Sequence, residues 1–196
     1  MVAVILAAGF STRFGDNKLL AKLNGKPVIK CVSDTVEKCP FDKVFLVYHN
    51  PEVAKAVEGS SIKTVFNPLS ALGQSTSVNA GVTAADDTDA YMFFPGDQPF
   101  IDESTVISLQ KAYYDGRGLI IAPTYNGKRG SPVIFDEFFK NALLSITGDT
   151  GGKTVIEANP EKLYEVPVEN TAAGLDIDTR EDYKKYGGEG LTTDME

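Results

Sequence analysis

The chain has 196 residues, of which 42% are hydrophobic and 23% are charged, an ordinary composition for a soluble globular protein that buries a substantial core. The net charge of −8 argues against a general nucleic-acid-binding surface, and no apolar run approaches the ~20 residues of a membrane span. No charged segment precedes the first apolar run, so we expect no signal peptide and a cytoplasmic protein with neither nucleic acid nor membrane as a partner.

Residues 2–18 read VAVILAAGFSTRFGDNK and constrain the function most tightly. The apolar run at 2–6 is typical of a strand that is buried on both faces of a parallel sheet. The small side chains at 7–9 let a ligand approach the backbone, and the loop beyond them is rich in hydrogen-bond donors and positive charge. The residues that supply these groups are Ser11, Thr12, Arg13 and Lys18. The pattern predicts a loop that binds a polyphosphate.

Two common phosphate-binding patterns do not fit this loop. Gly9 and Gly15 are separated by five residues and Asp16 follows, so the pattern GxxxxGK[ST] fails. The pattern GxGxxG fails because the second residue after Gly9 is a serine. Residues 1–30 nevertheless carry five Lys and Arg against one Asp, a local charge of +4 on an acidic protein. Such a local basic site suits a small anion.

Beyond this loop, helices and strands are predicted to alternate. The sequence indicates helices over residues 27–38, 51–57, 78–84, 102–114 and 137–144, with a further helical segment that ends at 159. It indicates strands over 42–48, 62–66, 91–94, 119–122 and 163–168, and a basic turn at 128 that enters a strand ending at 135. This alternation favours one α/β domain over 1–186 with a mostly parallel sheet, followed by a disordered Gly-rich and acidic tail over 187–196.

The strand predicted at 91–94 is followed by the sequence PGDQP at 95–99. An acidic residue just beyond the carboxyl end of a buried strand lies where open α/β sheets bind their ligands. We therefore expect Asp97 to be a metal ligand. The competing interpretation is an ordinary turn residue between a glycine and a proline.

Two further loops are rich in glycine and hydroxyl groups. The sequence GQSTS at 73–77 leads into the helix predicted at 78–84, and the unpaired amides of a helix start bind anions or base edges. A serine that merely caps this helix is the alternative. The sequence GDTGG at 148–152 forms a flexible loop of the kind that closes over substrates.

Near the end of the chain, Asp176 and Asp178 occupy alternate positions. In an extended stretch their side chains point to the same face, so both can approach one site. Capping of a helix by Asp178 or Thr179 is the competing explanation. Carboxylates, a phosphate loop and a polar helix start together describe a site for a nucleoside triphosphate with its metal. Mg²⁺ suits this site because it prefers a few carboxylates together with phosphate oxygens and water.

The sequence offers no convincing nucleophile or general base. His49 is the only histidine, and we interpret it as structural or solvent-facing. Cys31 and Cys39 match no zinc or redox motif. Catalysis would then consist of positioning and charge neutralisation at phosphorus. An acceptor that is itself a phosphate monoester is ionised near neutral pH and needs no base.

The segment LAAGFSTRFGDNK at 6–18 resembles the signature of the MobA-like nucleotidyltransferases. Together with GDQP at 96–99 and DIDT at 176–179, it is similar to the molybdenum cofactor cytidylyltransferase branch of that family. The resemblance extends from residue 2 to about residue 186. It implies a single-domain α/β, Rossmann-like nucleotidyltransferase fold, whose mostly parallel sheet has a mixed edge and helices on both faces.

The resemblance also implies roles for individual residues. Arg13 and Lys18 would hold the triphosphate and act in catalysis together with Asp97. Asp97 would be the chief Mg²⁺ ligand, and Asp178 would be the second one. The expected nucleotide-binding residues are Leu6, Ala7, Ala8, Gly9, Ser11, Thr12, Arg13, Lys18, Asn67, Ser77 and Gly96. The expected acceptor-binding residues are Gln98, Pro99, Arg129, Gly130, Ser131, Gly151 and Gly152.

The implied reaction transfers CMP from CTP to the terminal phosphate of molybdopterin cofactor and releases pyrophosphate. Ala8 stands where guanylyl enzymes of the family typically carry a second glycine, whereas Ser131 stands where relatives often have histidine. GTP as donor, and a sugar, polyol or methylerythritol phosphate as acceptor, are alternatives. In a different class, the protein would be a non-catalytic carrier that delivers finished cofactor to a molybdenum hydroxylase. Transient contact with such a hydroxylase is an expected partnership.

Overall fold

In the computed structural model, which describes residues 1–12, 14–85 and 87–187, the first apolar run forms β1 (Val2–Ala7). Five of its six residues are buried, as expected for a strand covered on both faces. β1 pairs in parallel with β4 (Lys43–Tyr48) on one side and with β6 (Ala90–Pro95) on the other. β1 is thus a central strand of the sheet. Of the predicted tail at 187–196, residues 188–196 lie outside the described residues.

The main sheet has eight strands in the described part of the chain, in the order β10-β7-β9-β6-β1-β4-β5, with β8 beside β7. β5 (Lys63–Phe66) is parallel to β4, and β10 (Leu163–Pro167) is parallel to β7 (Ile120–Tyr125). β9 (Val133–Asp136) is antiparallel to both β6 and β7, and β8 (Lys128–Arg129) is antiparallel to β7. The prediction of a mostly parallel sheet with a mixed edge is therefore confirmed.

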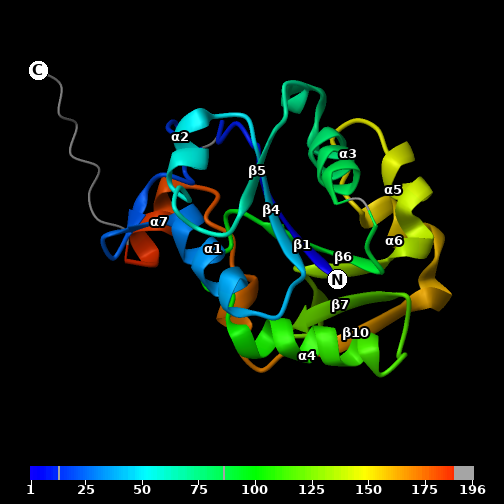
Figure 1. The fold of residues 1–196 in the computed structure, drawn as a ribbon. Coiled ribbons are helices and arrows are strands. Elements are labelled where there is room, and N and C mark those ends of the chain that lie inside the picture. Colours follow the sequence, from blue (N-terminus) through cyan, green and yellow to red (C-terminus); the bar gives the residue numbers. More distant parts are fainter. Residues whose placement is uncertain (13, 86, 188–196) are drawn as a thin grey trace, which may run out of the picture.

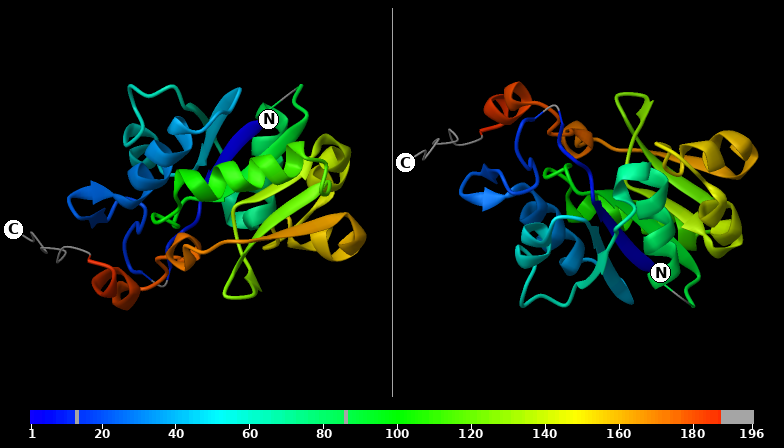
Figure 2. Two further views of the ribbon diagram at one scale, coloured as in Figure 1. Left: turned by 90° about the horizontal axis from the view of Figure 1, so that it is seen from below. Right: turned by 90° about the horizontal axis from the view of Figure 1, so that it is seen from above.

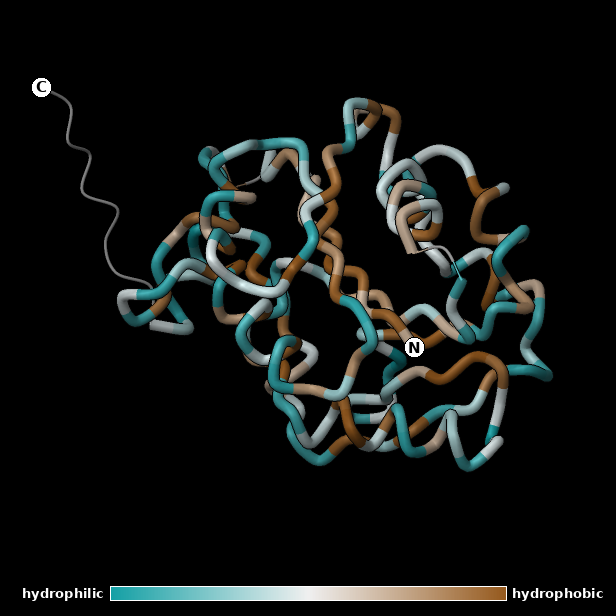
Figure 3. The backbone as a smooth tube through the Cα atoms, in the orientation of Figure 1, coloured by the Kyte–Doolittle hydropathy of each residue, from teal (hydrophilic) through white to brown (hydrophobic). Residues whose placement is uncertain are grey.

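Helices cover both faces of this sheet (Figures 1 and 2). The helices are α1 (Val28–Lys38), α2 (Pro51–Lys55), α3 (Gln74–Ala84), α4 (Glu103–Tyr114), α5 (Lys140–Ser145), α6 (Lys153–Ala158) and α7 (Arg180–Lys185). Ala3 and Ile5 of β1 share one apolar cluster with α1 and α4, whereas Val2 and Val4 share the opposite cluster with α3, α5 and α6. The period of two along a strand thus produces two cores. Hydrophobic stretches accordingly run through the middle of the molecule (Figure 3).

Several helix boundaries differ from the predicted ones. The helix predicted at 78–84 already begins at Gln74, because Gly73 adopts a φ of 109° and the chain turns directly into the helix. The short helix predicted at 51–57 ends at Lys55. The helix predicted at 137–144 divides into a 3₁₀ turn (Glu137–Phe139) and α5. Shorter 3₁₀ turns also occur at Ser70–Leu72, Pro160–Lys162 and Thr171–Gly174.

Two tight hairpins are absent from the predicted elements. β2 (Lys22–Leu23) pairs with β3 (Lys26–Pro27) around Asn24-Gly25, and β7 pairs with β8 around Asn126-Gly127. All four turn residues have positive φ, between 50° and 81°. Asn-Gly is the typical pair for such a turn, so the sequence carried this signal. None of the helices in the described part of the chain is long and apolar enough to cross a membrane.

The packing of α3 against the sheet can be tested at Gly81. A Cβ atom at this position would lie 2.4 Å from Cγ1 of Val4 on β1, so the helix can approach the strand only with glycine here. Gly81→Ala should therefore lower the free energy of unfolding by about 1–3 kcal/mol through overpacking. Urea unfolding measures the change, and the loss should shrink in a Val4→Ala background. An alanine variant that gains stability, as at an exposed helix position, would contradict this packing.

Candidate active site

The predicted site residues follow the two strands at which the strand order reverses. Successive strands are added on one side of β1, as β4 and β5, before β6 returns to its other side. Ligands of open α/β sheets bind beyond the carboxyl ends of the strands at such a switch point. The amide of Gly96 donates a 2.9 Å hydrogen bond to the carbonyl of Leu6, which holds the two strand ends together. A Cβ on Gly96 would lie 3.0 Å from that same oxygen.

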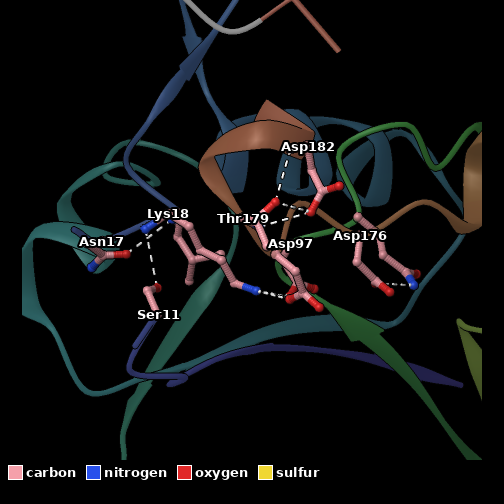
Figure 4. A network of polar contacts seen from close by, with 10 residues as sticks. Ser11, Asn17, Lys18, Asp97, Asp176, Thr179 and Asp182 are labelled. Carbon is pink, nitrogen blue, oxygen red and sulfur yellow. Dashed lines mark hydrogen bonds and ion pairs between the residues drawn. The ribbon is translucent and has the colours of Figure 1, made fainter. Parts of the chain in front are cut away.

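Three charged side chains from distant parts of the sequence meet at this point (Figure 4). The ammonium Nζ of Lys18 lies 2.6 Å from Oδ2 of Asp97 and 2.8 Å from Oδ1 of Asp178. The exposed fractions of these side chains are 13% for Lys18, 22% for Asp97 and 33% for Asp178. This partly buried cluster brings together the predicted phosphate-binding lysine and the two predicted metal ligands.

The cluster changes the proton affinity of its members. Burial alone would lower the pKa of Lys18, but the charges and hydrogen bonds of Asp97 and Asp178 outweigh it, so the pKa is raised. Lys18 is therefore a cation at neutral pH. Asp176 lies to one side and accepts a 2.8 Å hydrogen bond from Nε2 of Gln98. Desolvation and the nearby carboxylates of the cluster raise the pKa of Asp176.

The loop after β1 is folded back on itself. Ser11, with a φ of 52°, accepts hydrogen bonds at its carbonyl from the amides of Phe14 and Gly15. Its hydroxyl oxygen accepts a 3.2 Å hydrogen bond from the amide of Lys18. Asn17 accepts a 3.1 Å hydrogen bond from the amide of Leu19. These contacts place Lys18 at the base of the loop. Arg13, a predicted ligand of the triphosphate, lies outside the described residues.

The last helix, α7, fastens this loop from the other side. Nε of Arg180 donates a 2.9 Å hydrogen bond to the carbonyl of Phe14, and the hydroxyl of Tyr183 donates one of 2.5 Å to the carbonyl of Lys22. Thr179 caps α7 in a reciprocal capping box with Asp182. The capping interpretation therefore holds for Thr179, while the preceding aspartate is directed to the Lys18 cluster. One short segment thus supplies both a helix cap and a site carboxylate.

A cavity of about 640 Å³ extends from the cluster toward the start of α3. It is lined by Leu6, Ala8, Gly9, Phe10, Thr12, Lys18, Ser70, Ala71, Leu72, Gly73, Gln74, Ser77, Pro95, Asp97, Asp149 and Asp178. A smaller pocket of about 160 Å³ beside it adds Ser11 and Leu19 to the lining. Most of the predicted nucleotide-binding residues therefore line this cavity or the pocket beside it. Their contact with a nucleotide remains a prediction.

The start of α3 is covered by the second glycine-rich loop. The amide of Ser75 donates to the carbonyl of Gly148 at 3.2 Å, and the amide of Gln74 donates to Oδ1 of Asp149 at 3.4 Å. A Cβ on Gly73 would lie 2.4 Å from the backbone of Gly148, so the loop packs against this turn. The amides of the helix start are thus bonded by the protein itself rather than by a serine cap. Loop 148–152 therefore packs directly against the start of α3.

A second cavity of about 780 Å³ lies on the other side of that loop. Its lining includes five of the predicted acceptor-binding residues, which are Arg129, Gly130, Ser131, Gly151 and Gly152. Its apolar lining comes from Val78, Phe93, Val133, Phe135 and Ile156. The two cavities share Leu6, Gln74, Pro95 and Asp149, so they adjoin at the ends of β1 and β6.

Among the predicted residues that the structure describes, five do not line these cavities. They are Ala7, Asn67, Gly96, Gln98 and Pro99. Asn67 is buried and donates from Nδ2 to Oγ1 of Thr76 at 2.9 Å and to Oγ of Ser77 at 3.0 Å, which positions the start of α3. Gln98 is buried and directs its side chain to Asp176. Conversely, Phe10, Gln74 and Asp149 line the first cavity although none of them is a predicted site residue. Each lies inside a loop that the sequence pattern does identify.

The two carboxylates of the cluster fit a divalent cation. Oδ2 of Asp97 and Oδ1 of Asp178 converge on one nitrogen atom that already carries a positive charge. Within residues 1–12, 14–85 and 87–187, no group of three or more His, Cys, Asp or Glu side chains is placed to hold a metal ion. Mg²⁺ and similar ions commonly take one or two carboxylates and obtain their other ligands from phosphate and water. The donor set therefore suits a metal that binds together with a phosphate ligand.

Comparisons with known proteins give the family and the fold of the chain. The protein is 25% identical to the "probable molybdenum cofactor guanylyltransferase" of Thermococcus sibiricus over 200 residues, covering 96% of this chain and 98% of that protein. The crystal structure of the Mycobacterium tuberculosis rv0371c homolog from Mycobacterium sp. strain JC1 has a TM-score of 0.82 at 28% identity, covering 94% and 93% of the two chains. The structure of Rv0371C from Mycobacterium tuberculosis H37Rv in complex with manganese shares the fold, with a TM-score of 0.77 at 21% identity and coverage of 95% and 97%.

A match to a protein-family model is consistent with these similarities. Residues 3–163 match the family described as the MobA-like NTP transferase domain, and this range contains all of β1 except Val2, the loop that follows it, and β6. The predicted membership of the MobA-like family is therefore confirmed, whereas the cytidylyltransferase branch stays a prediction. The chain belongs to the MobA-like NTP transferase family and is a nucleotidyltransferase.

Proposed function

We propose that this nucleotidyltransferase moves CMP from CTP to the terminal phosphate of molybdopterin cofactor and releases pyrophosphate. The observation that carries the proposal is the cluster of Lys18, Asp97 and Asp178 in the lining of one cavity, which adjoins a second cavity at the ends of β1 and β6. One cavity is lined by the phosphate loop and the start of α3, and the other by apolar residues and two basic side chains. Two substrates that exchange a group at phosphorus need such an arrangement.

In this proposal, the phosphate loop holds the triphosphate of the donor. Gly9 has open space where a Cβ would stand, so phosphate oxygens can approach the backbone there. Thr12 and Lys18 face the same hollow, and Arg13 is proposed to add a second positive charge. Asp97 and Asp178 would hold Mg²⁺ or a similar ion, which supplies charge neutralisation at the phosphate oxygens.

The proposed reaction needs no protein base. An ionised phosphate oxygen of the acceptor forms a bond to the α-phosphorus of the donor, and the bond from that phosphorus to the bridging oxygen breaks. Pyrophosphate takes the electron pair of the broken bond and leaves. Lys18 stabilises the negative charge that moves onto the departing oxygens. The absence of a histidine among the residues that line the two described cavities is compatible with this chemistry.

The acceptor cavity supports a large ring-containing acceptor. Phe93 and Phe135 provide an aromatic surface. Arg129 and Lys153 bring two positive charges to the same lining, which also contains Asp149 and Glu157, and Nζ of Lys153 lies 3.7 Å from Oε1 of Glu157. A flat heterocycle that carries a phosphate matches both properties, because the ring packs on the aromatic surface and the phosphate pairs with a cation. A small sugar or polyol phosphate uses the charge but not the apolar wall.

The choice of nucleobase has two candidates. Ala8 lines the nucleotide cavity and stands where the guanylyl enzymes typically carry glycine, which supports CTP. GTP is the second candidate, because the Thermococcus sibiricus relative is named a guanylyltransferase.

An assay of the purified protein decides among these activities. With Mg²⁺ and molybdopterin cofactor, we expect pyrophosphate release with CTP that is well above the release with GTP, ATP or UTP. Omitting the acceptor should abolish it. Preference for GTP would reverse the base assignment. Release with a sugar, polyol or methylerythritol phosphate instead would replace the acceptor. If no nucleotide is consumed while the cofactor is bound, the protein is a carrier.

Replacing the carboxylates one at a time tests their roles. Asp97→Ala and Asp178→Ala should each lower kcat by a factor on the order of a hundred, as for other lost groups that stabilise transition-state charge. Asp176→Ala is the matched control, and it should stay close to the unsubstituted protein because Asp176 bonds to Gln98 rather than to Lys18. Near-normal turnover of the Asp97 variant would refute the proposed metal site, and a large loss in the Asp176 variant would move the second ligand to that residue.

A further inference from the structure

The side chain of Lys18 stands between the two carboxylates proposed to hold the divalent cation. Its Nζ atom is 2.6 Å from Asp97 and 2.8 Å from Asp178, and both oxygens accept hydrogen bonds from it. A cation placed between these two oxygens would occupy the volume of the Lys18 ammonium. The same two carboxylates therefore cannot bind Lys18 and a metal at this point together.

The protein without nucleotide supplies few ligands to a metal ion at this position. Asp97 and Asp178 supply two oxygens, and the described residues place no third acidic, His or Cys side chain to complete a metal-binding group with them. Asp176, the nearest further carboxylate in sequence, is bonded to Gln98. A cation that enters the free site has to displace a charged lysine and obtain only two protein ligands.

A bound triphosphate would provide new partners for the Lys18 ammonium and additional ligands for the cation. Lys18 lines the cavity together with Gly9 and Thr12, so phosphate oxygens in that cavity lie within reach of its ammonium group. Lys18 can then exchange its carboxylate partners for phosphate ones without losing a charge partner. The phosphate also contributes oxygen ligands to the cation, as Mg²⁺ sites in nucleotide-binding proteins require.

We infer that Lys18 is a built-in counter-cation that keeps the divalent-cation site closed until a triphosphate draws it away, so that the metal and the nucleotide bind interdependently. The inference rests on the proposed function only in taking Asp97 and Asp178 as the metal ligands. Because coupling between two ligands is reciprocal, the cation must strengthen nucleotide binding by the same factor by which the nucleotide strengthens cation binding.

The experiment measures the binding of Mn²⁺ to the full chain without any nucleotide, by electron paramagnetic resonance of the free ion. Lys18→Met removes the ammonium group and keeps an unbranched side chain, and Lys18→Gln removes the charge but keeps a hydrogen-bond donor. Both variants should bind Mn²⁺ more tightly than the unsubstituted protein, by about tenfold to a hundredfold, within the usual range of coupling between ligands. Lys22→Met is the matched control, since Lys22 is exposed on β2, and its affinity should not change.

Two further arms complete the test. Asp97→Asn added to Lys18→Met should abolish the gain, which places the bound ion at this cluster, and thermal melting checks that each variant is folded. Equal Mn²⁺ affinity of the folded Lys18 variants and the unsubstituted protein would overturn the inference. So would a gain that survives Asp97→Asn.

This outcome is separable from that of the transferase assay, because no turnover is measured. A gain in Mn²⁺ binding without any nucleotidyl transfer would support the Lys18 inference and refute the proposed reaction. Transfer activity with unchanged Mn²⁺ binding would do the reverse.

Discussion

The contact of one lysine with two aspartates joins the whole site. Lys18 comes from the loop after β1, Asp97 from the turn after β6, and Asp178 from the segment before α7. Each of these segments is placed by contacts of its own, and the backbone also connects the last two, because the amide of Ile177 donates to the carbonyl of Asp97 at 3.0 Å. The charges therefore meet only when the sheet, the loop after β1 and the last helix are all in place.

The second organising feature is the division of the cleft by loop 148–152. Its backbone and Asp149 satisfy the amides at the start of α3, and its glycines allow close packing against neighbouring groups. A Cβ on Gly151 would lie 2.9 Å from the side chain of Gln74, and one on Gly152 would lie 2.5 Å from the ring of Phe135. The loop thus touches residues of both cavities. A movement of this loop would alter both cavities together.

The sequence predicted much of the fold because its strongest signals are local. The β-branched run at 2–6, the prolines at helix boundaries and the alternation of strands with helices are all properties of short segments. The position of Asp97 followed from a rule about open α/β sheets, which bind ligands beyond the carboxyl ends of their strands. The switch point itself is visible only in the observed strand order. The start of α3 was predicted too late in the chain, because Gly73 begins the turn with a positive φ that composition alone does not reveal. The β2–β3 hairpin was overlooked although Asn24-Gly25 signals it.

The sequence by itself determined the residue types of the candidate site, namely a glycine-containing loop with a lysine, which is predicted to bind phosphate, and carboxylates beyond buried strands. The tertiary structure alone decided that Asp178 rather than Asp176 shares Lys18 with Asp97, that Asn67 supports α3 from inside the core, and that Gln98 turns toward Asp176. The physical reason is that side-chain direction in an irregular segment depends on contacts with residues far away in the sequence. A pattern of residues along one chain holds no record of those distances.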